Sequence, residues 1–266
     1  MCMNEQTEEL EFLLRSENRA ELLAALASDG PLDRYDLEEA LGTSRRTVSR
    51  TLKKLETRSY ISETDEGYCL TAFGASVFET YREYTRRLDL AERLRPFLGN
   101  VDGDALDVEL AALEGATLTL ADDASPYAPI DRTLELRAGA SRIREVAPSV
   151  EKRSIEQLTE RVEGGDDVTF EVVLTADAAK AAQSQPEYER AHRITQRSDD
   201  VEQFVYRGEL PFFLGVMDET VAIGAVVDGS PTALIESRDE QLRAWAERRI
   251  DEFRSESIPM REVLAD

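Results

Sequence analysis

Residues 35–58 read YDLEEALGTSRRTVSRTLKKLETR, and this stretch decides the fold of the domain around it. Its first seven residues predict a short helix that Gly42 ends, and Ser44 is a typical N-cap for a second helix over 44–58. The apolar residues of the second helix are spaced four and three apart and form one buried stripe: Val48, Leu52 and Leu55. A short helix, a glycine-containing turn and a second helix are typical of the helix-turn-helix, whose second helix lies in the major groove of DNA.

The second helix is basic although the whole chain is acidic. The chain has 55 Asp and Glu against 32 Lys and Arg, a formal charge of −23, whereas residues 44–58 hold six cations and one acid. We expect the first half of this helix to reach base edges and the second half to contact phosphates. The predicted DNA-binding residues are Ser44, Arg45, Arg46, Thr47, Ser49 and Arg50, followed by Lys53, Lys54 and Arg58. The alternative is a basic face that is only solvated.

The residues on either side complete a winged helix. Residues 18–30 predict a further helix, and short alternating runs at 60–63 and 68–70 predict a β-hairpin. The tip of this hairpin is acidic, with Glu63, Asp65 and Glu66. We therefore do not expect the wing to lie against phosphate unless bound cations bridge the two.

These residues carry a family resemblance. GTSRRTVSRTLKKLETRSYI (42–61) is similar to the recognition region of many prokaryotic winged-helix transcription regulators. The longer stretch from ELEFLLRSENRAELLAAL to TAFG resembles the N-terminal domain of regulators common in halophilic archaea. The composition also resembles halophilic proteins, because only 4 basic residues are lysines (Lys53, Lys54, Lys152 and Lys180) and acids are spread along the chain. An acidic mesophilic surface is the alternative.

A long helix is predicted over 71–99. Apolar residues recur alternately four and three apart along it, as in a coiled-coil seam. The seam consists of Val77, Tyr81, Tyr84, Leu88, Ala91 and Leu98, with Arg95 as its polar exception. We expect this stripe to form a homodimer, which would present two recognition helices to a two-fold DNA site. Packing on the C-terminal domain is the alternative. Phe73, Phe78, Leu90 and Leu94 lie off the seam and are expected to pack on the winged domain or on the N-terminal helix around Leu10, Leu13 and Leu14.

The remaining residues predict an α/β domain. Strands and helices alternate at first and strands then cluster, which is typical of an α/β sandwich with a mixed sheet. The expected domains are therefore 1–70, a winged helix-turn-helix, 71–99, a dimerising helix, and 100–266, an α/β domain. Residues 125–148 and 208–254 resemble the C-terminal effector domain of the archaeal methanogenesis-regulator type, which is related to the sensor domain of sugar-responsive TrmB regulators. The resemblance implies a fold like that of phospholipase D, used for sensing.

The sequence contains no motif for phospholipase-type catalysis and too few histidines and cysteines for a typical metal site. Phospholipase-type catalysis needs a histidine with a lysine two residues on, but the single histidine, His192, is followed by Arg193 and Ile194. One histidine and two cysteines predict no metal site and no cofactor. The candidate ligand residues are Tyr127, Asp218, Glu236 and Arg238. Simpler readings are loop packing for Tyr127, a hairpin turn at Asp218-Glu219 and a helix cap at Ser237.

The expected function is that of a DNA-binding transcription regulator whose C-terminal domain senses a small molecule or a partner. The alternative is a protein-interaction module with a winged-helix fold that no longer binds DNA. No apolar run approaches the roughly 18–20 residues of a membrane span, and the N-terminus lacks the features of a signal peptide. We therefore expect a cytoplasmic protein.

Overall fold

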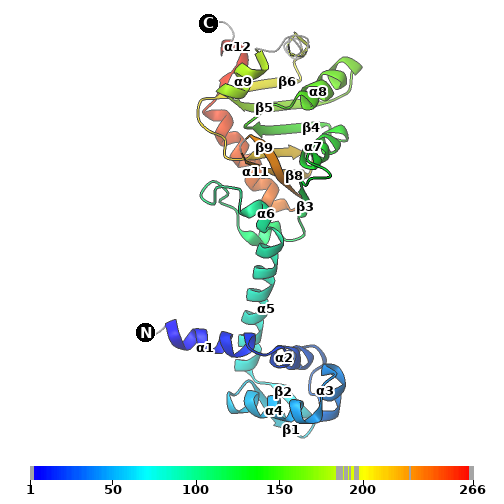
Figure 1. Cartoon of the computed structure of the whole chain (residues 1–266), viewed down its shortest axis with the longest axis vertical. Coiled ribbons are helices and arrows are strands. Elements are labelled where there is room, and N and C mark those ends of the chain that lie inside the picture. Colours follow the sequence, from blue (N-terminus) through cyan, green and yellow to red (C-terminus); the bar gives the residue numbers. More distant parts are fainter. Residues whose placement is uncertain are drawn as a thin grey trace. The chain divides into compact units, whose positions relative to one another are not determined.

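The computed structural model describes residues 3–183, 188, 191, 193–194, 198–227 and 229–263 (Figure 1). His192, the histidine weighed as a catalytic group, lies outside these residues. Contacts divide the chain into two units, Met1–Asp89 and Leu90–Asp266. The three-part division by function, with boundaries at 70 and 99, stays a prediction. No helix among the described residues is long and apolar enough to cross a membrane.

The first unit is a winged helix, as predicted. Its elements are α1 (Met3–Leu14), α2 (Glu17–Asp29), α3 (Arg34–Leu41), α4 (Arg45–Thr57), the hairpin strands β1 (Ile61–Thr64) and β2 (Gly67–Leu70), and the first turns of α5 (Ala72–Arg93). An antiparallel bridge between Leu32 and Tyr68 joins the segment before α3 to the hairpin. The core buries the apolar faces of these elements and includes Leu22, Leu23, Leu37, Val48, Leu52, Leu55 and Tyr60.

A glycine is required where α5 begins. A Cβ atom at Gly74 would lie 1.9 Å from the carbonyl oxygen of Tyr60, so only a residue without a side chain permits this approach. Phe78, one turn further on, is buried in the same core. The start of α5 is thereby fixed against the segment between α4 and the hairpin.

The long helix is interrupted before its predicted end. α5 ends at Arg93, and a separate short helix, α6 (Arg95–Leu98), follows it. Pro96 lies in the first turn of α6 and has no N–H to continue the hydrogen-bond ladder of α5. The prediction that Leu90 and Leu94 pack on the winged domain was wrong, because both lie in the core of the second unit with Phe97.

The second unit is built on a mixed β-sheet, which confirms the expected class. The strand order is β10-β6-β5-β4-β7-β8-β9-β3, with β4, β5 and β6 parallel and the other neighbours antiparallel. The strands are β3 (Thr117–Leu120), β4 (Arg142–Ala147), β5 (Thr169–Thr175), β6 (Val201–Tyr206), β7 (Phe213–Met217), β8 (Thr220–Val227), β9 (Ser230–Ser237) and β10 (Ile258–Pro259).

Helices cover both faces of this sheet (Figure 1). One face packs against α11 (Glu240–Ser255), through Leu242, Trp245, Ile250 and Phe253, and against η1 (Leu110–Leu113). The other packs against α7 (Ala128–Ala138), α8 (Lys152–Gly164), α9 (Ala176–Gln183) and α12 (Met260–Val263). Because side chains alternate along a strand, Val146 of β4 faces α11, while Ile143 and Ala147 face α7 and α8. Trp245 lies in the core, and its indole N–H donates to Asp107 at 2.7 Å.

Candidate DNA-recognition helix and ligand cavity

Helix α3 and the turn that joins it to α4 are fixed by caps. Asp33 and Asp36 form a capping box at the start of α3. The turn begins at Gly42, which ends α3 with φ of 58°, in the left-handed region that favours glycine. Ser44 then caps α4, with its Oγ accepting from the backbone N–H of Thr47 at 3.3 Å. The orientation of α4 is therefore set by local hydrogen bonds as well as by its buried stripe.

The opposite face of α4 is exposed and cationic. Val48, Thr51, Leu52 and Leu55 are buried, whereas Arg45, Arg46, Arg50, Lys53 and Lys54 are exposed, and Thr47 and Ser49 are half-buried between the two faces. The side chain of Arg45 is 80% exposed and 3.9 Å from Glu38. Within the described part of the chain, the other four cations form no ion pair. The helix therefore presents uncompensated positive charge.

Arg58, predicted as a phosphate contact, is placed differently. Its guanidinium donates to Glu8 and Glu9, at 2.9 Å each, and lies over the ring of Phe12. The hydrogen bond to Glu8 and the charge of Glu9 outweigh burial and raise the pKa of Arg58. This arginine joins α1 to the end of α4 and is not free for DNA. Because its partners are 49 and 50 residues away in the chain, the local pattern gave no signal of this role.

A cation that the sequence did not suggest belongs to α2. Burial, and then the positive charges of Arg58 and Arg50, lower the pKa of Arg19. Arg19 donates to the carbonyl oxygen of Phe12 and lies over its ring. It adds positive potential near α4 while being held by α1.

The hairpin tip is acidic and exposed, as expected. Glu63, Asp65 and Glu66 are all exposed. Arg34 approaches Glu63 at 3.9 Å, but its closer contact is a hydrogen bond of 2.6 Å to the hydroxyl of Tyr68. The strands of the wing therefore have no exposed basic residue that could contact a phosphate.

The predicted helical seam is divided between different surroundings. Val77 and Tyr81 pack against the winged-helix core, and Leu98 packs against the core of the second unit. Ala91 is half-buried. Tyr84 and Leu88 remain exposed, at 42% and 45%, and form the part of the seam that is left for another surface.

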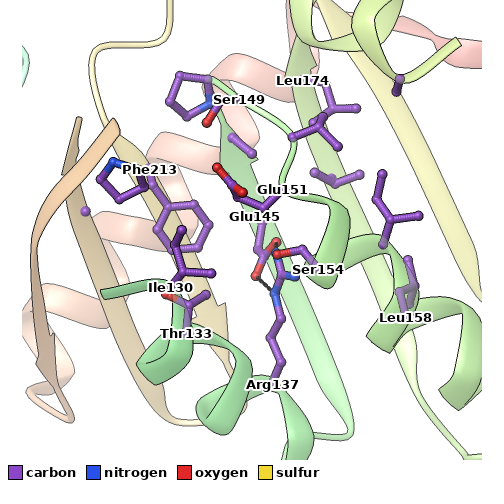
Figure 2. A pocket seen from close by; sticks show the side chains of 18 of the residues that line it. Ile130, Thr133, Arg137, Glu145, Ser149, Glu151, Ser154, Leu158, Leu174 and Phe213 are labelled. Atoms are coloured by element: carbon purple, nitrogen blue, oxygen red, sulfur yellow. Dashed lines mark hydrogen bonds and ion pairs between the residues drawn. The ribbon is translucent and has the colours of Figure 1, made fainter. Parts of the chain in front are cut away.

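A cavity of about 370 Å³ lies in the second unit, on the face of the sheet that α7 and α8 cover (Figure 2). Its wall is mostly apolar and includes Ile130, Leu158, Phe170, Val172, Leu174, Phe213 and Leu234. The polar groups come mainly from Thr133 and Arg137 of α7, Glu145 of β4, and Ser149, Glu151 and Ser154 around the start of α8.

A buried ion pair forms part of the wall of this cavity. The side chains of Arg137 and Glu145 are 9% and 0% exposed, and the guanidinium donates through Nε and Nη2 to the two carboxylate oxygens. Figure 2 shows the pair among the lining side chains, with Ser154 and Glu151 drawn in the same view. Arg161 of α8 donates to the backbone carbonyl oxygen of Arg137 at 2.6 Å, which ties the two helices together beside the pair.

The predicted ligand residues do not line this cavity. Asp218 occupies the turn between β7 and β8, and its carboxylate accepts from the backbone N–H groups of Ser141 and Arg142. Glu236 accepts two hydrogen bonds from Arg132, which raise the pKa of that arginine. Tyr127 is exposed before α7, and Arg238 is exposed with a 3.4 Å contact to Thr220. The cap of α11 is Asp239, not Ser237.

The cavity could not be predicted from the sequence, because the residues that line it come from many separate segments of the chain. The one local signal was a glutamate inside the β-prone run at 143–146, where a buried charge requires a partner. That partner, Arg137, lies on the preceding helix.

Two family models match the chain. Residues 7–93 match the HVO_A0261 N-terminal domain, and residues 126–256 match the middle domain of the methanogenesis regulatory protein FilR1. A comparison with curated proteins found no match.

Several solved structures resemble the chain distantly. The archaeal chromatin protein TrmBL2, described as having a novel mode of DNA binding, is 14% identical over 95% of this chain and 99% of its own, with a TM-score of 0.41. Reduced MarR from E. coli is 20% identical over 41% and 75%, with a TM-score of 0.31. NucT from Helicobacter pylori is 11% identical over 54% and 98%, with a TM-score of 0.41. On the two family matches, the protein belongs to the winged helix-turn-helix transcription regulators that join an HVO_A0261-type N-terminal domain to a FilR1-type middle domain.

Proposed function

We propose that the protein is a homodimeric transcription regulator that binds an operator through α4 and adjusts this binding when its second unit takes up a small molecule. The observation that carries the proposal is the exposed cationic face of α4, on which four of the five exposed cations have no acidic partner among the described residues although the chain has a charge of −23. A globally acidic protein repels DNA, so a retained basic ridge indicates a phosphate-bearing partner.

The positions of the side chains on α4 divide their proposed roles. Arg45, Arg46 and Arg50 belong to the part of a recognition helix that reaches base edges, where arginine pairs with guanine. Lys53 and Lys54 lie further along and would contact phosphates. Ser44 and Thr47 hold the start of the helix by hydrogen bonds to each other and remain close enough to the same groove to contribute. Arg58 is left out of the proposed interface because Glu8 and Glu9 hold it.

Dimerisation is proposed to use the exposed part of α5. Tyr84 and Leu88 lie four residues apart on a helix and therefore on one face, and both are exposed. A second copy of the same face would bury them and place two recognition helices at half-sites of a symmetric operator. Val77 and Tyr81 support this interface only indirectly, since they already pack within the winged helix.

Effector sensing is proposed for the second unit, together with the phospholipase D-like sensor fold that the resemblance implied. The support is the apolar cavity between the sheet and its helices, which has a volume within the range of small-molecule sites. A ligand that fills it would change operator affinity by binding one state of the dimer better than another.

The acidic surface is proposed as an adaptation to concentrated salt. At molar ionic strength the repulsion between exposed charges is screened to within roughly 3 Å. The protein would then tolerate its charge of −23 and still approach DNA through α4.

One observation favours a second candidate, a protein-interaction module without DNA binding. The exposed tip of the wing carries Glu63, Asp65 and Glu66, which would repel a phosphate backbone. In the first candidate function α4 contacts DNA, and in the second it does not. A variant that removes two arginines of α4 distinguishes them.

The test is a genome-wide map of bound sites for the wild type and for Arg46→Ala/Arg50→Ala, with and without candidate nutrients. We expect discrete sites for the wild type and their loss in the double variant. Arg248→Ala/Arg261→Ala, which removes the same charge from exposed positions of the second unit, is the matched control and should keep the sites. Equal maps for the first two proteins would refute DNA recognition by α4.

A further inference from the structure

The cavity of the second unit is selective in the charge that it can accept. Its volume of about 370 Å³ and its largely apolar wall suit a small organic molecule. Among the described residues that line it, the charged ones are Arg137, Glu145 and Glu151. One cation and two carboxylates in this described lining leave no surplus positive charge to neutralise an anionic ligand.

The ion pair nevertheless offers a polar anchor. Nε and Nη2 of Arg137 donate to Glu145, while Nη1 makes no hydrogen bond to any described residue. Each oxygen of an ionised carboxylate can accept more than one hydrogen bond, so Glu145 also retains acceptor capacity. A group that accepts from the guanidinium, or donates to the carboxylate, could therefore join the pair without displacing either partner.

The remaining polar groups of the wall are uncharged or already used. Thr133 donates its hydroxyl to the carbonyl oxygen of Pro129 at 2.9 Å. Ser149 and Ser154 contribute hydroxyl groups from either side of the start of α8. Burying an anion against this wall would carry an unpaired charge into a mostly apolar space, which is strongly unfavourable.

We propose that the cavity binds an uncharged, mostly apolar molecule, an alcohol, aldehyde or ketone with a hydrocarbon or aromatic body, whose oxygen hydrogen-bonds to the Arg137–Glu145 pair. This inference rests on the effector-sensing part of the proposed function and specifies the chemistry of the effector. The apolar body fills the space lined by Leu158, Phe170 and Leu174.

The test uses two fluorescent probes that share one skeleton and differ in charge. N-phenyl-1-naphthylamine is neutral, and 8-anilinonaphthalene-1-sulfonate carries the same rings with a sulfonate. Both are titrated into the full-length protein in near-molar potassium chloride. We expect saturable binding of the neutral probe at least ~10-fold tighter than that of the sulfonate, because the one cation of the described lining, Arg137, is already paired with Glu145. Equal or tighter binding of the sulfonate would overturn the inference.

Variants locate the probe. Ser154→Trp places a large side chain at the cavity and should weaken the neutral probe at least ~10-fold, since overfilled space excludes the ligand. Glu160→Trp, at an exposed position of the same helix outside the cavity, is the matched control and should bind as the wild type does. Unchanged binding in Ser154→Trp would show that the probe binds elsewhere and would overturn the assignment.

A second variant keeps the inference testable if Ser154→Trp does not fold. Glu145→Gln leaves the charge of Arg137 uncompensated, so the sulfonate should gain affinity relative to the neutral probe; no gain would count against the pair as the anchor. Arg46→Ala/Arg50→Ala should bind the neutral probe normally. A wild type that binds the neutral probe but no DNA would refute only the proposed function, and a wild type that binds DNA but not the neutral probe would refute only this inference.

Discussion

Arg137→Met is expected to destabilise the second unit strongly. The substitution leaves Glu145, whose side chain is 0% exposed, without its two hydrogen bonds from the guanidinium. Removal of one partner of a buried ion pair costs about 3–5 kcal/mol, because the remaining charge stays in an apolar environment.

We therefore expect the single variant to lose about 3–5 kcal/mol of its free energy of unfolding. The double variant Arg137→Met/Glu145→Leu should lie within about 1 kcal/mol of the wild type, because an apolar replacement leaves no charge to bury.

The assay is urea unfolding followed by tryptophan fluorescence at pH 7, in the same near-molar salt. The chain has one tryptophan, Trp245, and it lies in the core of the second unit, so the signal reports the unit that holds the pair. A loss of less than about 1 kcal/mol in the single variant, or a double variant as unstable as the single one, would contradict this expectation.

Three further predictions concern packing, assembly and pH. Gly74→Ala should lower the stability of the winged helix by about 3 kcal/mol, measured by thermal unfolding, because its Cβ would meet the carbonyl of Tyr60 at 1.9 Å. If the protein forms the proposed dimer, Leu88→Glu should be a monomer in light scattering, whereas Leu120→Glu, at an exposed leucine of β3, should stay dimeric; a monomeric wild type would contradict the proposed assembly. Burial favours the neutral form of Glu247, but hydrogen bonds from two arginines of β4 outweigh burial and lower the pKa of this carboxyl. Its ionised form therefore stabilises the second unit above about pH 4.3, and this contribution is lost as the pH falls further. Stability of the second unit that does not fall between pH 5 and pH 3 would contradict this.

Local patterns predicted the elements well because the information lies within each element. The helix over 44–58 is found at Arg45–Thr57, and the hairpin lies at Ile61–Leu70. The N-cap serine of α4 and its stripe of buried aliphatic residues depend only on neighbouring positions in the sequence. The mixed sheet also followed from the alternation of strands and helices.

Contacts between distant residues were not predictable in the same way. Arg58 looked like one more cation of the basic helix, but Glu8 and Glu9 pair with it from the N-terminal helix. Leu90 and Leu94 looked like part of the winged domain, but the break before Pro96 and the core around Phe97 place them in the second unit. Both outcomes depend on tertiary packing, for which spacing along the chain carries no signal.

The candidate ligand residues illustrate the same limit. Asp218 and Glu236 are polar residues at strand ends, which is where many α/β proteins bind ligands. In the structure their carboxylates are occupied, by the backbone of Ser141 and Arg142 and by Arg132. The cavity is lined instead by residues of α7, α8 and the sheet that share no motif.

Titration with duplex DNA measures whether α4 is the helix that recognises the operator. Full-length wild type, Arg46→Ala/Arg50→Ala and the charge-matched Arg248→Ala/Arg261→Ala are titrated with a fragment from the promoter of the protein's own gene, at one fixed salt concentration. Two lost base contacts at about 1 kcal/mol or more each predict at least a ~30-fold weaker complex for the first variant. The second variant is predicted to stay within about twofold of the wild type, because its arginines lie outside the interface. Equal affinities for all three proteins would contradict recognition of DNA by this helix.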